Sequence, residues 1–532
     1  MSEPAYGIDL GTTYSAIARI SDLGGTEIIK NFEGDDTTPS AVYFEGPGAA
    51  IVGTEAKRVA PTAPDNACLL IKRHMGTEYP QEFQGESYTP EAISSMIIKE
   101  LVNAANNQTG RSITKVVITV PAYFGVKERE STRQAGQMAG VDVIGIVTEP
   151  VAAALSIGAR SDKDETILVY DLGGGTFDTT IMQISNGSVK VISVDGNREL
   201  GGADWDSVLF DLVVEKFIES AELGDDDPRY DEDFALDLRL EIETLKKTLS
   251  RRESANVRVA YEGEKATIEV TRDEFEQATR HLILQTIEIS ERALSTALEK
   301  DSSIVIDRVL LVGGSSRMPM VKESLKEHLG WDAQDTEFDL AVAKGAAIYG
   351  QAAVDEVLAT GDEESTPEIS DDAPTRAFFP GGAAKLDIVN VLSRGIGCGL
   401  VREEDHDEHF VRFLVHANDQ IPCSAEPVKA SAITDGQTTV KVTMYEQGGE
   451  QESDALEDND LLKETTLELP EPIDRGDPID VTLEVSSEGL ATMVVTDATS
   501  GKSVQLEAML SVLSKEQVAE ETAKVSAMAL RS

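Results

Sequence analysis

The chain carries one short glycine- and threonine-rich pattern twice, and this duplication constrains the fold more than any other feature. The first copy is Gly7-Ile8-Asp9-Leu10-Gly11-Thr12-Thr13, and the second is Val169-Tyr170-Asp171-Leu172-Gly173-Gly174-Gly175-Thr176. Each copy predicts a strand that ends near its aspartate, a tight turn and a second strand, whereas Walker and Rossmann loops open a helix. Such a turn directs several backbone N–H groups at one point and lets a phosphate approach closely. Two turns therefore predict two similar lobes that hold a polyphosphate between them, with an aspartate in each copy to attract a divalent cation.

A third glycine-rich loop supports this interpretation. Gly313-Gly314-Ser315-Ser316-Arg317 directly follows a predicted strand from Val309 to Val312. One such loop alone is a weak signal, because glycine-rich turns are common and often only structural. Three loops in matching contexts favour a nucleotide site over three unrelated turns.

The charge of the chain limits its partners. Its 532 residues include 96 acidic and 47 basic side chains, for a formal net charge of −49. This excess argues against nonspecific binding to nucleic acid or to anionic membranes, both of which need basic patches. The acidity is compatible with a high-salt habitat or with simple solubility. The acidic runs at 225–227 and 362–364 are interpreted as solvated loops.

The chain shows no features of a secreted or membrane protein. The start has no basic, apolar leader, and no apolar run is long enough to span a bilayer. The three cysteines are scattered without metal-ligand spacing and fit a reducing compartment. We therefore expect a cytoplasmic protein.

Residues 1–353 alternate short β-rich runs with helical stretches, which predicts an α/β nucleotide-binding unit of two lobes. A buried strand is expected at Val116 to Val120. Helices are expected at Glu91 to Ala105, Lys127 to Ala139 and Phe234 to Leu249.

The rest of the chain has a different organisation. Residues 354–385 are acidic and aperiodic, which predicts a linker that ends in an apolar stretch from Leu386 to Leu392. Residues 386–510 alternate as an all-β domain, with a hairpin around 481–495. In residues 511–532, Ser514 and Gln517 form a capping-box pattern before one amphipathic helix that is expected to end the chain.

Several charged residues are candidates for chemistry, each with a plainer alternative. Glu243, Lys246 and Ser250 share one helical face, which suits a sugar and a base, although such stripes are usually just solvated. Lys72 follows an apolar run and can bring a positive charge to a γ-phosphate, or it is a surface lysine. Glu149 precedes Pro150 at a helix start, where it either caps the helix or aligns an attacking water.

Together these residues resemble the seventy-kilodalton heat-shock chaperone family (DnaK-like), over nearly the whole chain. The motifs that carry the resemblance are Gly7 to Ser15, Val120-Pro121-Ala122-Tyr123-Phe124, Asp171 to Asp178 and Gly313 to Pro319. The resemblance implies an actin/hexokinase-like ATPase domain, a β-sandwich peptide-binding domain, and a C-terminal lid that is here reduced to one short helix. It also implies ATP or ADP with Mg²⁺ as the ligands.

The resemblance implies roles for individual residues. Phosphate binding would fall to Gly11, Thr12, Thr13 and Tyr14 from one lobe, and to Gly173, Gly174, Gly175 and Thr176 from the other. Asp9 and Asp171 would orient magnesium mostly through its waters. Lys72 would contact the γ-phosphate, with Glu149 and Thr176 near the hydrolytic water. The cleft would be lined by Gly201 and Gly202, and the nucleoside would be held by Glu243, Lys246, Lys247 and Ser250 under Gly313, Gly314, Ser315, Arg317 and Asp339.

The β-domain would bind extended peptides through backbone hydrogen bonds and apolar pockets. Val440 and Val442 occupy family-like pocket positions, although core packing explains alternating valines equally well. ATP in the first domain should weaken peptide binding in the second, through the apolar end of the linker.

The chain departs from the family pattern in places that affect its partners. The shortened lid predicts faster peptide release. Gly145 stands where an arginine usually helps to bind J-domain proteins, so that a J-domain partner is in doubt. The apolar end of the linker matches the family linker only loosely. Ala203 replaces a common acidic residue, and Lys247 replaces an arginine that stacks on adenine, which should soften base binding.

The sequence therefore predicts an ATP-hydrolysing chaperone for unfolded polypeptides, and the resemblance implies a nucleotide exchange factor as one of its partners. One alternative is a nucleotide-gated adaptor for a single dedicated partner. A small-molecule kinase on the same fold is disfavoured, because it would not need the appended β-domain.

Overall fold

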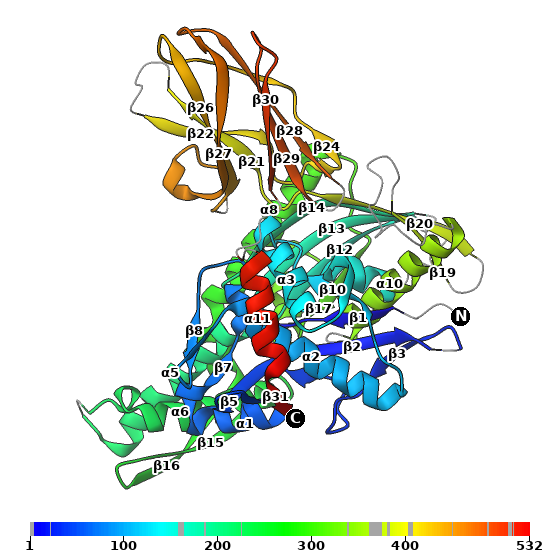
Figure 1. The fold of residues 1–532 in the computed structure, drawn as a ribbon. Coiled ribbons are helices and arrows are strands. Elements are labelled where there is room, and N and C mark those ends of the chain that lie inside the picture. The colour runs from blue at the N-terminus through cyan, green and yellow to red at the C-terminus, as the bar shows by residue number, and fades with distance from the viewer. Residues whose placement is uncertain are drawn as a thin grey trace.

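The computed structural model describes residues 5–21, 23–157, 164–185, 188–224, 226–337, 340–360, 375–379, 383–402, 408–449, 451–486, 489–508, 513 and 515–531. Figure 1 shows two α/β lobes with a β-sandwich at one end and helix α11 lying against the first lobe. We call residues 5–157 lobe I, residues 164–337 lobe II, and residues 392–508 the sandwich, because Leu392 already belongs to its core.

Lobe I is built on a mixed sheet in the order β11-β10-β1-β2-β3. Its strands are β1 (Tyr6–Asp9), β2 (Tyr14–Ile20), β3 (Thr26–Ile29), β10 (Lys115–Val120) and β11 (Asp142–Thr148), with β4 (Thr38–Pro39) beside β2. A smaller sheet contains β5 (Ala41–Gly46), β6 (Ala49–Val52) and β7 (Ala67–Leu69), and β8 (Gln81–Phe83) pairs with β9 (Glu86–Tyr88). The helices are α1 (Thr54–Val59), η1 (Ala60–Thr62), η2 (Pro64–Asn66), η3 (Ile71–His74), α2 (Pro90–Thr109), α3 (Val126–Met138) and α4 (Glu149–Ile157).

Lobe II repeats this topology. Its sheet contains β18-β17-β12-β13-β14, where β12 pairs antiparallel with β13 and parallel with β17, as β1 does with β2 and β10. The strands are β12 (Glu165–Leu172), β13 (Phe177–Ser185), β14 (Ser188–Asn197), β17 (Arg308–Val312) and β18 (Ala333–Asp335), with a separate hairpin of β15 (Ser254–Tyr261) and β16 (Glu264–Thr271). The helices are α5 (Gly202–Ala221), η4 (Pro228–Tyr230), α6 (Glu232–Leu249), α7 (Arg272–Ala278), α8 (Arg280–Lys300), η5 (Gly314–Arg317) and α9 (Pro319–Leu329). The duplicated sequence pattern thus marks a duplicated sheet.

The sandwich packs two antiparallel sheets around one apolar core. One sheet contains β21 (Ile396–Val401), β22 (His409–Val415), β26 (Gln437–Gln447) and β27 (Asn459–Ile473), and η6 (Leu456–Asp458) precedes β27. The other contains β24 (Cys423–Ser424), β25 (Val428–Ser431), β28 (Pro478–Val485), β29 (Ala491–Asp497) and β30 (Ser503–Ala508). The expected hairpin around 481–495 is formed by β28 and β29, in which Leu483 pairs with Met493.

The predicted linker at 354–385 is more structured than its composition suggested. Helix α10 (Ala341–Thr360) passes the expected boundary at 353, and β19 (Thr375–Phe379) lies inside the linker. The apolar end is a strand, β20 (Ala383–Val391), that extends the sheet of lobe II by pairing in parallel with β14 and antiparallel with β19. β23 (Gln420–Ile421) of the sandwich also pairs with β20. Backbone pairing, which composition does not reveal, orders this part of the segment.

The end of the chain also differs from the expectation. Helix α11 (Lys515–Ala527) forms, but it stops before the end, and a short strand, β31 (Ala529–Arg531), follows it. A lid remnant would lie over the sandwich, whereas α11 contacts α2 and α3 of lobe I. The proposed cap residue Ser514 lies outside the described residues.

Candidate functional site

A cavity of about 1270 Å³ lies between the two lobes and collects residues from distant parts of the chain. Among the residues that the sequence singles out, its lining contains Asp9, Gly11, Thr12, Thr13, Tyr14, Lys72, Glu149, Asp171, Gly173, Gly174, Thr176, Gly202, Glu243, Lys246, Lys247, Ser250, Gly313, Gly314, Ser315 and Arg317. Gly175 and Gly201 are not among the lining residues; they lie against each other, so that a Cβ added at Gly201 would meet the backbone of Gly175 at about 2.5 Å. Asp339 lies outside the described residues.

The two glycine turns meet across the cleft. A Cβ added at Gly174 would lie 1.6 Å from Thr13 Oγ1, and one added at Gly175 would lie 2.4 Å from Thr12 Cγ2. Glycine is therefore required for the close approach of the two lobes, not only for turn geometry. Thr13 Oγ1 is buried and has no hydrogen-bond partner among the residues that the structure describes, so that this hydroxyl is available in the cleft as a donor and an acceptor.

An acidic cluster surrounds one lysine at the floor of the cavity. Lys72 Nζ donates to Glu149 Oε1 at 2.7 Å, and both residues are buried. Asp9, at the end of β1, accepts a hydrogen bond from Thr119 Oγ1. Burial raises the pKa of Asp171 well above its ordinary value, and the nearby carboxylates of Glu149, Asp178 and Asp9 raise it further.

This cluster fits a divalent cation bound mainly through water. The mutual repulsion that raises the pKa of Asp171 is the kind that a cation relieves. Within the described part of the chain, no three His, Cys, Asp or Glu side chains converge closely enough to ligate a metal by themselves. Mg²⁺ usually keeps several waters and uses one or two carboxylates plus substrate phosphates, and this donor set suits that mode of binding.

Asp178 belongs to the same cluster, although the sequence analysis assigned it no role. It accepts a hydrogen bond from the backbone N–H of Tyr123, and burial together with Glu149 raises its pKa to about 7. Its position at the start of β13, two residues after Thr176, is the signal that could have identified it.

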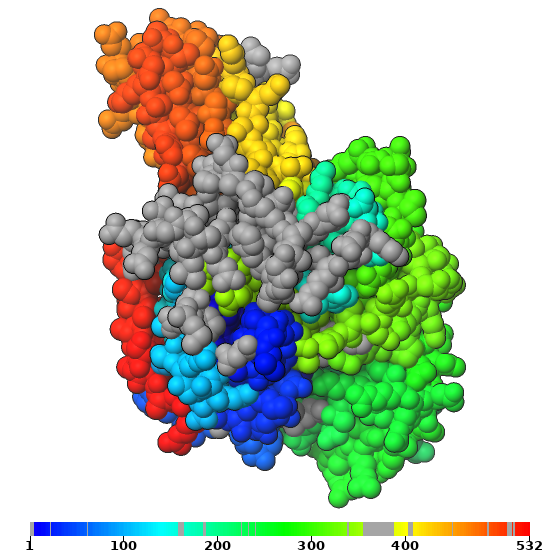
Figure 2. Space-filling model, turned by 90° about the vertical axis from the view of Figure 1, so that its right-hand side faces the viewer, coloured from blue at the N-terminus to red at the C-terminus, as the bar shows by residue number. Residues whose placement is uncertain are grey.

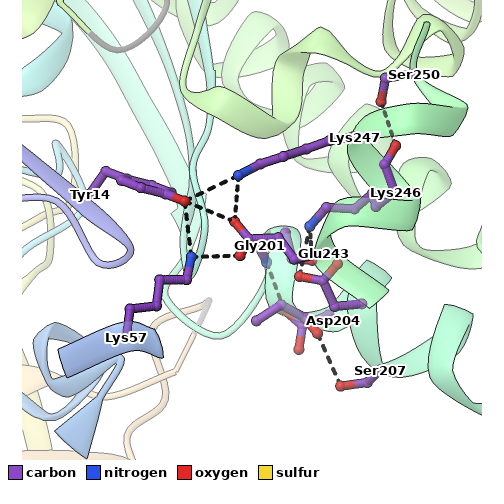
Figure 3. Close-up of polar contacts among 12 residues, drawn as sticks. Tyr14, Lys57, Gly201, Asp204, Ser207, Glu243, Lys246, Lys247 and Ser250 are labelled. Atoms are coloured by element: carbon purple, nitrogen blue, oxygen red, sulfur yellow. Dashed lines mark hydrogen bonds and ion pairs between the residues drawn. The ribbon is translucent and has the colours of Figure 1, made fainter. Parts of the chain in front are cut away.

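The other end of the cavity is closed by a polar network between the lobes (Figure 3). Lys57 Nζ, on α1 of lobe I, lies 2.5 Å from Glu243 Oε2 on α6 of lobe II. Lys57 and Lys247 both donate to the Tyr14 hydroxyl, at 3.0 and 3.1 Å. Burial alone would raise the pKa of Glu243, but the ammonium groups of Lys57 and Lys247 outweigh it and lower the pKa to about 2.

The remaining residues of the helical stripe have partners within lobe II. Lys246 Nζ donates to the Gly202 carbonyl at 2.7 Å and pairs with Asp206 at 2.8 Å, while Ser250 Oγ donates to the Lys246 carbonyl. Figure 3 shows Lys246 and Lys247 extending from the same helix toward different partners. The stripe therefore faces the cleft and is not a merely solvated face.

Arg73 is a second interlobe residue that the sequence analysis missed. Its Nε donates to the Gly175 carbonyl at 2.9 Å, and its Nη2 lies 2.8 Å from Asp204 Oδ2 on α5. Asp204 in turn accepts from the backbone N–H of Gly201 at 2.7 Å. Neither Lys57 nor Arg73 belongs to a glycine-rich motif, so that the local sequence holds no signal for either residue.

The sandwich contacts lobe I through a buried ionic cluster. Arg394, almost fully buried, lies 3.6 Å from Glu128 and stacks over the Tyr123 ring. Glu446 accepts a hydrogen bond from the backbone N–H of Val126 at 3.1 Å. Burial raises the pKa of Glu446 to about 7, against the opposing effect of Arg394.

Three further positions named in the sequence analysis, Val440, Val442 and Gly145, lie outside the cavity lining and are explained by local packing. Val442 is buried in the sandwich core and Val440 packs against that core, which is what core packing alone requires. A Cβ added at Gly145 would lie 2.9 Å from Tyr349 Cε1, so that an arginine would need Tyr349 to move.

No helix in the described ranges is both long and apolar enough to cross a membrane.

Comparisons with known proteins agree with this architecture. The family model described as Hsp70 protein matches residues 5–84 and 80–362. The chaperone protein DnaK of Thermosipho africanus (strain TCF52B) is 37% identical over 509 residues, which cover 94% of this chain and 79% of that protein. The chain therefore belongs to the Hsp70 family of ATP-dependent chaperones.

Proposed function

We propose that the interlobe cavity binds ATP with Mg²⁺ and hydrolyses the bond between its β- and γ-phosphates, and that the sandwich binds extended segments of unfolded polypeptides. One observation supports the site most directly. The two glycine-rich turns, of the kind that can bind phosphate, meet beside the buried Lys72 and an acidic cluster. Phosphoryl transfer needs positioning and charge neutralisation more than covalent help from the protein, and this site offers both.

The position of each residue around the cavity suggests its role in binding and hydrolysing ATP. The turns at Gly11 to Tyr14 and at Gly173 to Thr176 would hold the phosphates through backbone N–H groups, with Thr13 Oγ1 as an additional partner. Lys72 would bring its charge to the γ-phosphate, while Glu149 holds Lys72 in place and orients the attacking water. Asp9 and Asp171 would hold the waters of Mg²⁺, which supplies neutralisation of phosphate charge when bound.

The nucleoside would lie near the network that closes the cavity. Glu243, with its lowered pKa, is a carboxylate at neutral pH and can accept hydrogen bonds from ribose hydroxyls. Lys247, which is half exposed and already bonded to Tyr14 and Glu243, offers no planar group for stacking on adenine. We therefore expect adenine to bind more weakly here than it would beside an arginine at position 247.

Coupling between the nucleotide-binding lobes and the sandwich would pass through β20 and through the contact of the sandwich with lobe I. β20 joins the lobe II sheet directly, and the sandwich rests on residues 123–128 of lobe I through Arg394 and Glu446. A change in the angle between the lobes would disturb both contacts together. A nucleotide exchange factor remains a proposed partner. A conventional J-domain protein is disfavoured because position 145 is glycine, where even an added Cβ would lie 2.9 Å from Tyr349 Cε1.

Calorimetry and turnover measurements on the full chain test this function. Titration of ATP should release heat in the presence of Mg²⁺, and ATP turnover should rise when a panel of unrelated unfolded peptides is added. Absence of nucleotide heat would refute the site, whereas nucleotide binding without any peptide response would refute the assignment of the sandwich.

A further inference from the structure

The backbone of the lobe I turn is oriented by lobe I itself. The carbonyl of Gly11 accepts a hydrogen bond from Ser40 Oγ at 2.7 Å, and the carbonyl of Thr13 accepts one from the Ser40 N–H at 2.9 Å. Ser40 is buried and follows β4 of the same lobe. The orientation of these peptide groups therefore does not depend on lobe II.

The lobe II turn is oriented differently. Each of its three glycine carbonyls accepts a hydrogen bond from a protein donor. The carbonyls of Gly173 and Gly174 accept from two backbone N–H groups at the start of α5, at 2.9 and 2.8 Å, and so depend on lobe II alone. The carbonyl of Gly175 accepts instead from Arg73 Nε at 2.9 Å, and Arg73 belongs to η3 of lobe I. One peptide group of this turn is thus oriented by the opposite lobe.

The other edge of these peptide groups is unoccupied. In a trans peptide the C=O of one residue and the N–H of the next point in opposite directions, so that fixing the Gly175 carbonyl also fixes the Thr176 N–H. Among the described residues, none accepts a hydrogen bond from the N–H of Gly174, Gly175 or Thr176. Gly174 and Thr176 line the cavity. Successive unpaired N–H groups form a nest for an anion, and Arg73 orients the last of the three.

A second contact holds Arg73 in this position. Its Nη2 lies 2.8 Å from Asp204 Oδ2, and Asp204 also accepts from the Gly201 N–H, as Figure 3 shows. The planar guanidinium keeps Nε and Nη2 at a fixed spacing, so that one side chain bonds two parts of lobe II at once. A Cβ added at Gly175 would lie 2.9 Å from Arg73 Nε, so that glycine allows this close approach.

The Arg73 contacts exist only while the two lobes lie close together. Figure 2 shows lobe I, mainly blue, beside lobe II, mainly green, below the sandwich. When the lobes separate, Arg73 leaves with lobe I and the Gly175 carbonyl loses its donor. Because glycine has few conformational limits, the peptide group between Gly175 and Thr176 is then free to rotate. A carbonyl turned toward the cavity repels phosphate where an N–H would bind it.

We propose that Arg73 is a positioning residue for the phosphates of the bound nucleotide. By holding the Gly175 carbonyl, it aims the Thr176 N–H at a nucleoside polyphosphate, and it does so only in the closed cleft. Lobe II therefore reaches its full phosphate affinity only when lobe I covers it. Adenosine, which has no phosphate, gains nothing from this effect. The inference rests on the proposed nucleotide site and adds to it a residue that acts through the backbone of the opposite lobe.

Calorimetry on the full chain with Mg²⁺ tests the proposal through the ratio of ATP affinity to adenosine affinity, with adenosine measured by displacement. Arg73→Ala should lower this ratio by about tenfold, the typical effect of one hydrogen bond to a charged group. Arg73→Lys keeps the positive charge but not the planar fork, so that its ratio should also stay well below that of the unchanged chain. A loss of cleft closure alone would weaken ATP and adenosine equally and leave the ratio constant.

Arg19→Ala is the matched control. The side chains of Arg19 and Arg73 are 16% and 19% exposed, and their carboxylate partners lie at 2.9 and 2.8 Å. The partner of Arg19 is Glu27, and this pair joins β2 to β3 within lobe I, outside the cavity lining. The affinity ratio of Arg19→Ala should equal that of the unchanged chain.

The amide signal of Thr176 reports the orientation of this peptide group directly. In protein labelled with ¹⁵N-threonine, the Thr176 signal, assigned by its loss in Thr176→Ser, should shift when ADP with Mg²⁺ is added. The shift should be much smaller in Arg73→Ala saturated with ADP. An equal shift in both proteins, or a full affinity ratio in either Arg73 variant, would overturn the role of Arg73 and leave the nucleotide site in place. Absence of ATP binding by the unchanged chain would refute the site itself and this inference with it.

Discussion

Lys72 Nζ and Glu149 Oε1 lie 2.7 Å apart at the floor of the cleft, and both side chains are buried. Lys72 comes from η3, and Glu149 begins α4, so that two distant parts of lobe I place one positive charge among the carboxylates of the site. A buried pair of this kind leaves an uncompensated charge when one partner is removed. The pair is therefore both a candidate catalytic unit and a structural one.

Replacing the lysine tests the catalytic role. Lys72→Ala should still bind ATP with Mg²⁺, but single-turnover hydrolysis should fall by roughly 10²–10³-fold, the typical loss for one well-placed charged donor. The double variant Lys72→Ala/Glu149→Gln removes the unpaired carboxylate, so that its ATP affinity, and not its hydrolysis rate, controls for local destabilisation. Hydrolysis at the normal rate in Lys72→Ala would rule out this role.

The ion pair between Lys57 and Glu243 should slow nucleotide release, because it joins the lobes over the cavity. Both side chains are about three-quarters buried, so that the pair is worth about 1 kcal/mol or less. Lys57→Ala should therefore speed ADP release by roughly two- to fivefold, measured with a fluorescent analogue in stopped flow. Lys30→Ala, which breaks an exposed pair with Asp36 within lobe I, should release ADP as the unchanged chain does.

The contact between the two glycine turns predicts a steric requirement. An added methyl group at Gly174 would overlap Thr13, so that Gly174→Ala should weaken cleft closure by about 1–3 kcal/mol and lower ATP affinity accordingly. Gly46→Ala is a matched control, since nothing lies within 4 Å of its added Cβ. Equal ATP affinity for the two variants in calorimetry would show that the turns do not close on each other in solution.

Docking of the sandwich on lobe I should depend on pH through Glu446. Its carboxyl faces Arg394 from the sandwich, Glu128 and Arg129 from α3, and Asp460 from β27, with Tyr123 nearby. Burial raises its pKa from 4.5 to about 7 when docked, so the docked state holds the proton more tightly. Docking is therefore strongest below about pH 4.5 and weakens as pH rises toward 7, by up to about tenfold per pH unit.

The measurement is the docked fraction as a function of pH, from hydrogen exchange of segment 123–128. Glu446→Gln keeps an acceptor for the Val126 N–H but cannot titrate, so that its profile should be much flatter. A profile for Glu446→Gln as steep as that of the unchanged chain would assign the pH dependence to another group.

The duplicated turns, the strands that flank them and the helices at 91–105, 127–139 and 234–249 could be read from the sequence. Glycine spacing and apolar periodicity report local geometry, and α2, α3 and α6 occupy these ranges to within a few residues. The same signals predict the glycine turns that form part of the cavity lining, because each turn sets its geometry in its own backbone.

Only the tertiary structure decided which distant residues meet. Lys57 and Glu243, Arg394 and Glu128, and β31 and β6 are each separated by many residues, and no local pattern names the partner. The composition of the linker end and of the C-terminal segment gives no strong signal for a strand. Each nevertheless forms one, β20 or β31, by joining the edge of a sheet formed elsewhere. Local sequence determines the conformation a segment prefers, whereas burial and backbone pairing across the fold determine where that segment binds.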